Sequence, residues 1–124
     1  MTYNIFTNDA KKVIKTIFDC VNKGEDPQGT CIKTWDIKLT GENEKVLVHT
    51  AKTFDADEQQ WADKGCLSLT PNIDNDKITV KFHYWSSYPR DQRNDVDDKY
   101  VLGRFTELLM VHFDVQYNKV TINK

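Results

Sequence analysis

A strict two-residue alternation constrains the fold more than any other feature of this sequence. Between Lys77 and Tyr84, four apolar residues alternate with four polar ones. Side chains on a strand point alternately to the two faces of a sheet, so the pattern indicates one buried and one solvated face. We therefore predict a strand over Lys77–Trp85.

The residues that follow predict an exposed loop and then a long helix. The loop, residues 86–95, is rich in aromatic, Arg and Asp side chains and poor in small apolar ones. Over Val96–Phe113 the apolar residues share one broad helical face, and Asp95 or Asp97 is expected to cap the helix. Gly103 costs this helix about 1 kcal/mol relative to alanine, so we expect something to pack closely there.

An N-terminal helix is the second clear element. One apolar stripe runs from Ala10 to Val21, Thr7 or Asn8 can cap its start, and Gly24 can end it. The remaining strands are predicted from β-rich runs bounded by turns, at Thr30–Leu39, Lys45–Ala51, Cys66–Ile73 and Val115–Ile122.

The segment before the third strand is ambiguous. Asp55-Ala-Asp-Glu58 has the spacing of a capping box, which favours a short surface helix that would end at Gly65. A loop is the alternative. The expected order is therefore α-β-β-(α)-β-β-α-β. We predict an α+β fold, with a mostly antiparallel sheet of about five strands and the N-terminal and C-terminal helices packed on one face. Residues 1–124 should form a single domain, since no linker or repeat is present.

Charge and hydropathy exclude several classes of protein. There are 17 Lys and Arg residues against 19 Asp and Glu residues, which disfavours a nucleic-acid partner because phosphate binding needs a cationic excess. We find no signal peptide and no apolar run near the roughly 20 residues of a membrane span. We therefore expect a cytoplasmic protein that makes no membrane contact.

Cysteines and histidines give no metal or cofactor site. Cys20, Cys31 and Cys66 are an odd number at wide spacing, so we expect reduced and mostly buried thiols. The three histidines lie far from one another and from any cysteine, whereas zinc ligands usually include a close pair. We expect His83 on the solvated face of its strand, and His112 as a hydrogen-bonded imidazole on the apolar face of its helix.

The sequence also lacks a recognisable catalytic constellation. It has no G-x-S-x-G elbow, no phosphate-binding glycine loop, and no cysteine placed for a lowered pKa. Asp95, Asp97 and Asp98 look like a solvated helix start. We therefore predict that the protein is not an enzyme.

Two surfaces are candidate partner-binding sites. The first comprises Trp85, Tyr88, Arg90 and Arg93, because these residue types are enriched at binding hot spots. Alternatively, Trp85 packs under the loop and Tyr88-Pro89 only shapes the turn.

The second surface is an acidic strip around Trp61, made of Asp55, Asp57, Glu58 and Asp63. It would suit a cationic partner and could steer association. A plain solvated helix face is the alternative.

These observations favour a small protein that binds another protein and is not catalytic. By analogy in size, build and mild acidity, the narrower prediction is a bacterial immunity-type inhibitor that neutralises a cognate toxin with a basic surface. The alternative is a small-ligand binder or enzyme that uses His83 or His49 in a pocket between sheet and helices. That alternative requires an imidazole and a carboxylate within hydrogen-bond reach at the mouth of the pocket. The chain could act as a monomer or as a homodimer formed through an uncovered sheet face.

Overall fold

The computed structural model of the protein describes residues 2–50 and 61–123. Its elements, in chain order, are β1 (Thr2–Phe6), α1 (Ala10–Lys23), β2 (Trp35–Leu39), β3 (Lys45–His49), β4 (Gly65–Pro71), β5 (Lys77–Tyr84), the short 3-10 helix η2 (Arg90–Gln92), α2 (Asp97–His112) and β6 (Lys119–Asn123).

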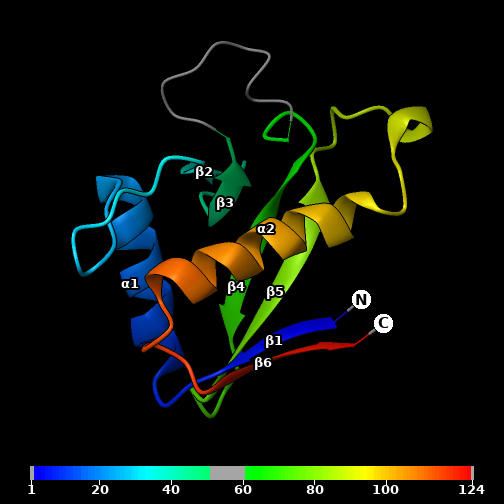
Figure 1. Ribbon diagram of the computed structural model, residues 1–124. Helices are drawn as coiled ribbons and strands as arrows, with labels where there is room; N and C mark the ends of the chain where they lie inside the picture. Colours follow the sequence, from blue (N-terminus) through cyan, green and yellow to red (C-terminus); the bar gives the residue numbers. More distant parts are fainter. Residues whose placement is uncertain (1, 51–60, 124) are drawn as a thin grey trace.

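The six strands form one antiparallel sheet in the order β2-β3-β4-β5-β1-β6. Figure 1 shows α2 lying across one face of the sheet and α1 beside it. Side chains from both helices and from that face share one buried cluster. The predicted α+β architecture is therefore confirmed, with six strands where about five were expected.

The additional strand is β1, which the sequence analysis did not identify. Its Tyr3 and Ile5 are fully buried, while Thr2, Asn4 and Phe6 point to the other face. β1 pairs with β5 on one side and with β6 on the other. The order therefore begins with a strand, which lies inside the sheet.

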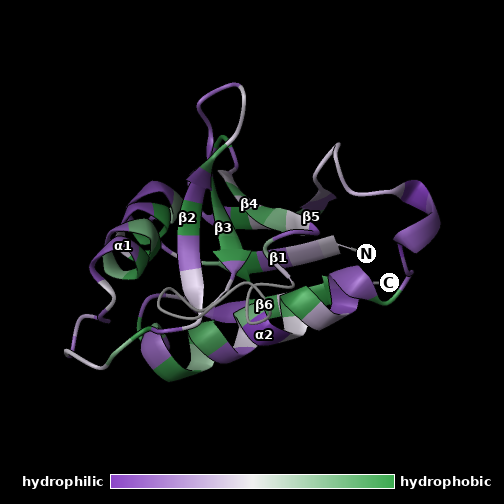
Figure 2. Cartoon of the chain, turned by 90° about the horizontal axis from the view of Figure 1, so that it is seen from above, coloured by the Kyte–Doolittle hydropathy of each residue, from purple (hydrophilic) through white to green (hydrophobic). Residues whose placement is uncertain are grey.

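The helix α1 begins and ends close to the predicted positions. Its N-cap is Asp9, one or two residues later than the residues expected, and the Asp9 side chain accepts a hydrogen bond from Lys12 N. Gly24 ends the helix with φ of +83°, a conformation that side chains with a Cβ rarely adopt. The buried residues of α1 occupy one stripe, as expected (Figure 2).

The helix α2 differs from the prediction at its start and at its glycine. Val96 is the N-cap and makes no side-chain capping bond, so neither Asp95 nor Asp97 caps the helix. A Cβ atom placed on Gly103 would meet no atom within 4 Å. The expectation of close packing at Gly103 inside this chain is therefore wrong.

β4 and β5 form an antiparallel hairpin that turns between Pro71 and Lys77. The close approach between backbones lies at Gly65, which begins β4 and does not end a helix. A Cβ atom there would collide with the carbonyl oxygen of His83 and would lie 2.8 Å from Phe82 Cζ. Most of the ambiguous segment, residues 51–60, lies outside the described residues, and residues 61–64 form a turn. No helix in the described ranges has the length and hydropathy needed to cross a membrane.

Candidate functional site

A continuous stack of cationic and aromatic side chains lies where α2 begins, at one end of β4 and β5. It joins the turn before β4, the end of β5, the following loop and the first half of α2. Its members, in spatial order, are Arg104, Tyr100, Trp61, Lys64, Tyr88, Tyr84 and Arg93. We call these seven residues the aromatic stack.

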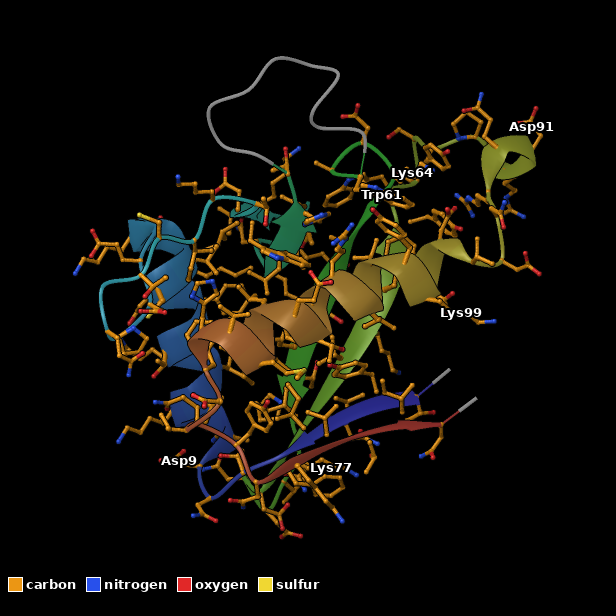
Figure 3. The ribbon with its side chains drawn as sticks, in the orientation of Figure 1. Asp9, Trp61, Lys64, Lys77, Asp91 and Lys99 are labelled. Atoms are coloured by element: carbon orange, nitrogen blue, oxygen red, sulfur yellow. The ribbon has the colours of Figure 1, made fainter. Side chains whose placement is uncertain are left out.

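At one end of the aromatic stack, Trp61 and Tyr100 lie nearly parallel with ring centroids 4.3 Å apart. Lys64 Nζ covers the other face of this pair, 4.3 Å from the Trp61 centroid, and Figure 3 shows the two side chains together. Arg104 Cζ lies 5.2 Å from the Tyr100 centroid. Cation–π contacts at such distances stabilise the arrangement by about 0.5–1 kcal/mol each at exposed sites.

The other end is built on two tyrosines. The rings of Tyr84 and Tyr88 are parallel, with centroids 5.8 Å apart, and Arg93 Cζ lies 4.6 Å from the Tyr84 centroid. Arg93 Nη2 also donates to the carbonyl oxygen of Tyr88 at 3.1 Å. These contacts tie the loop back onto the end of β5, so the loop is held by its own aromatic and arginine side chains.

Asp97 lies beneath the aromatic stack and is 2% exposed. Tyr84 Oη donates to its carboxylate at 2.8 Å, Asn94 N donates at 3.0 Å, and Lys64 Nζ lies 3.6 Å away. Burial raises the pKa of Asp97, but the hydrogen bonds and Lys64 outweigh it and hold the pKa below its usual range. The expectation that Asp97 belongs to a solvated helix start is therefore wrong.

The same network keeps Tyr84 neutral at physiological pH. Burial, together with the hydrogen bond to the Asp97 carboxylate, raises the pKa of Tyr84 to about 12. A phenol that donates to a buried carboxylate must keep its proton. The aromatic stack therefore rests on a fixed arrangement of charge, with Asp97 ionised and Tyr84 protonated.

The structure places the four predicted loop residues in different environments. Trp85 packs against a small cluster on the helix-free face and donates through Nε1 to Ala62 O at 2.6 Å. Tyr88 and Arg93 belong to the aromatic stack. Arg90 begins η2 and is exposed. The sequence analysis thus found two members of the aromatic stack in this loop.

The second predicted surface is only partly described. Asp55, Asp57 and Glu58 lie outside the described residues, whereas Trp61 is part of the aromatic stack. Lys64, Tyr84, Tyr100 and Arg104 were not proposed as site residues. They come from separate segments, and only the loop's density of aromatic and arginine residues pointed to this region.

The arrangement of the rings limits what the aromatic stack can bind. Each aromatic face described above is covered by another ring or by a cation. Bases and planar ligands bind aromatic residues by stacking on free ring faces. In the aromatic stack these faces are already covered. Tyr100 and Arg104 are exposed at the surface, and parts of the five half-buried side chains also reach it. Such groups bind protein surfaces well when their side chains are already ordered.

A separate cavity lies on the other side of Arg104, between α2, the start of β2 and the end of β3. Its volume is about 440 Å³, and Trp35, His49, Arg104, Glu107 and His112 contribute to its lining. His112 Nδ1 lies 2.7 Å from an oxygen of Asp26, a buried residue outside the lining. The hydrogen bond from His112 lowers the pKa of Asp26. The expected hydrogen-bonded state of His112 is confirmed.

Of the two histidines that the alternative prediction favoured, only His49 lines this cavity. His49 lines the same cavity, with its ring centroid 4.9 Å from that of Trp35, and burial lowers its pKa. His83 is exposed on the helix-free face, as expected, and its Nε2 lies 2.9 Å from Ser68 Oγ. Neither imidazole forms an ion pair with a carboxylate of the described residues.

The described residues also bear on cysteine and metal chemistry. Cys66 is buried, and burial raises the pKa of its thiol to about 11, so the thiol is a poor nucleophile at neutral pH. Cys31 is exposed, contrary to the expectation of mostly buried thiols, and Cys20 is half-buried. Within the described ranges, no group of three His, Cys, Asp or Glu side chains is placed to hold a metal ion.

Comparison with protein-family models, with curated proteins and with solved structures finds no match to this chain. The assignment of function therefore rests on the geometry of the aromatic stack and of the cavity.

Proposed function

We propose that this protein binds another protein through the aromatic stack, and that it acts by forming this complex and not by catalysing a reaction. The observation that carries the proposal is the pre-ordered state of seven Trp, Tyr, Arg and Lys side chains at a partly exposed surface. Trp, Tyr and Arg are the residue types that dominate binding hot spots.

Order in the free protein matters because association normally restricts side chains that were mobile. Each rotamer-rich side chain that becomes fixed at an interface costs about 0.5–1.5 kcal/mol. In the aromatic stack, much of this restriction has already occurred on folding. Trp85 helps to order the aromatic stack. Its indole Nε1 donates to Ala62 O, which holds the loop against the turn that carries Trp61 and Lys64.

In its narrower form, the proposal is that the partner is a toxin that the complex neutralises. The small size and mild acidity of the chain support this form by analogy alone. The first candidate partner to express and purify is the product of the gene next to the one that encodes this chain.

We expect Trp61→Ala to weaken the complex at least tenfold while leaving the fold intact, because Trp61 is central to the aromatic stack and only partly buried. The partner would be captured with the wild-type protein, identified by mass spectrometry, purified, and titrated by calorimetry. The matched control is Ile73→Ala, which removes an exposed apolar residue at the opposite end of the sheet. Equal affinity of the two variants, or no partner for the wild-type protein, would contradict the proposal.

A second candidate function is the binding of a small ligand in the 440 Å³ cavity. One observation favours it: the Asp26–His112 pair provides an oriented imidazole at a concave site, which is the geometry required of a ligand anchor or general base. The alternative prediction named His83 or His49 with a carboxylate at the mouth of the pocket, whereas this pair uses His112 with a buried Asp26 outside the lining.

A fragment screen monitored by NMR tests this second function. We expect fragments to shift the indole resonance of Trp35, and Val111→Trp to remove these shifts by filling the cavity that Val111 lines. Val115→Trp, which alters an exposed residue outside the lining, should leave them unchanged. If no fragment shifts the Trp35 resonance, or if both variants respond alike, the cavity is not a ligand site.

A further inference from the structure

The outward face of α2 carries apolar residues where a solvated helix is usually polar. Val96 is 53% exposed before the first turn, and Met110 is 64% exposed near the end. The same helical line contains Lys99, Gly103 and Glu107, at spacings of three or four residues. We call these five residues the α2 stripe. Figures 1 and 2 show no described element packed on this side of α2.

Gly103 occupies the centre of the α2 stripe. Glycine weakens a helix relative to alanine, and here it has neither a positive φ nor a neighbouring atom that a Cβ would meet. The fold of one chain therefore does not require it. A glycine on an exposed helix face does allow a second backbone to approach closely.

The α2 stripe is self-complementary about Gly103. Val96 and Met110 lie seven residues before and after it, and Lys99 and Glu107 lie four residues before and after it. In an antiparallel two-fold pair of helices, residues at equal distances on either side of the axis face each other. Apolar side chains would meet apolar ones, and each lysine would meet a glutamate.

The charged residues are placed for such contacts. Lys99 is exposed, points away from the body of the molecule in Figure 3, and forms no ion pair with the described residues. The Glu107 side chain is 65% exposed and contacts Arg104 from one side at 3.2 Å. Both oxygens of this carboxylate contact Arg104 Nη1, at 3.4 and 3.2 Å, and the exposed side chain remains accessible from solvent.

We propose that two copies of this chain associate through α2, antiparallel, with a two-fold axis at Gly103. Lys99 then pairs with Glu107 of the partner subunit, and Val96 packs on Met110 of the partner subunit. This interface is on α2, not on the uncovered sheet face. A 16-residue helix is about 24 Å long, so the interface is small and we expect a weak dimer that forms at high protein concentration.

Sedimentation equilibrium at increasing protein concentration tests the proposal, because the mass should rise from 14.5 kDa toward twice that value. Lys99→Glu and Glu107→Lys should each weaken association at least tenfold by placing like charges face to face. The double variant should restore it, since the two charges are exchanged. Lys11→Glu, an exposed change on α1, is the control and should have no effect.

Gly103→Gln supplies an independent test of the same axis. Its side chain should block close approach and weaken association at least tenfold, while the melting temperature of the monomer rises because glutamine is the better helix former. A protein that stays monomeric at millimolar concentration, or a dimer that none of these changes affects, would overturn the proposal. The dimer proposal does not depend on the aromatic stack, so its test and the Trp61→Ala test of the proposed function have separate outcomes.

Discussion

Replacing Gly65 with alanine should lower the free energy of unfolding by about 3 kcal/mol. The added Cβ would clash with the His83 carbonyl oxygen and lie 2.8 Å from Phe82 Cζ. The backbone cannot yield easily at this point, because Gly65 pairs with Tyr84 and Trp85 N donates to Lys64 O at 2.9 Å. Urea unfolding followed by circular dichroism would measure the loss.

The matched control is Gly41→Ala in the β2–β3 turn. No atom lies within 4 Å of a Cβ built on Gly41, and its φ is not positive. The same chemical change should therefore alter stability by less than about 0.5 kcal/mol. If both variants were equally stable, the two strands would not approach as closely at Gly65 as the structure shows.

Asp97→Asn should cost about 3 kcal/mol, because it leaves Lys64 without its buried counter-charge and weakens the bonds from Tyr84 and Asn94. Asp98→Asn, one residue further and half-exposed, should cost less than about 1 kcal/mol. Replacing Lys64 with methionine in the Asp97→Asn background should recover part of the loss, and a double-mutant cycle would give the coupling energy.

The effect of Asp97→Asn should also depend on pH. The folded state holds the pKa of Asp97 below the ordinary value of about 3.9, so its carboxylate stabilises the fold above that pH. This contribution is lost as the pH falls through the folded-state pKa. The stability difference between wild type and variant should therefore shrink below about pH 4. A difference that stayed constant down to about pH 2 would contradict an ionised, hydrogen-bonded Asp97.

Local periodicity was sufficient to predict the helices and hairpins of this fold. The stripe of α1, the broad face of α2 and the alternation in β5 each extend over at least eight residues, so their patterns are unambiguous. β1 has only five residues directly before a helix cap, which is too short for a reliable pattern. It was missed for that reason, and with it the strand order.

The candidate site was less predictable because its contacts join distant segments. Asp26 and His112 are 86 residues apart, and nothing in either local sequence indicates the pair. An aspartate at a helix start is ordinarily solvated, and Asp97 is buried only because Tyr84 and Lys64 fold over it. The density of Tyr, Trp and Arg in residues 84–93 did point to the loop that forms one end of the aromatic stack.

The position of β1 in the sheet has a consequence for how the chain acquires its fold during synthesis. Its backbone partners are residues 77–80 in β5 and 119–123 in β6. During translation, the segment that carries Tyr3 and Ile5 therefore has no strand partner until β5 and β6 have been synthesised. Such a nascent chain exposes an apolar strand for several seconds at ordinary elongation rates of about 5–20 residues per second. Chaperone capture at this stage would be directed at the segment that later forms β1.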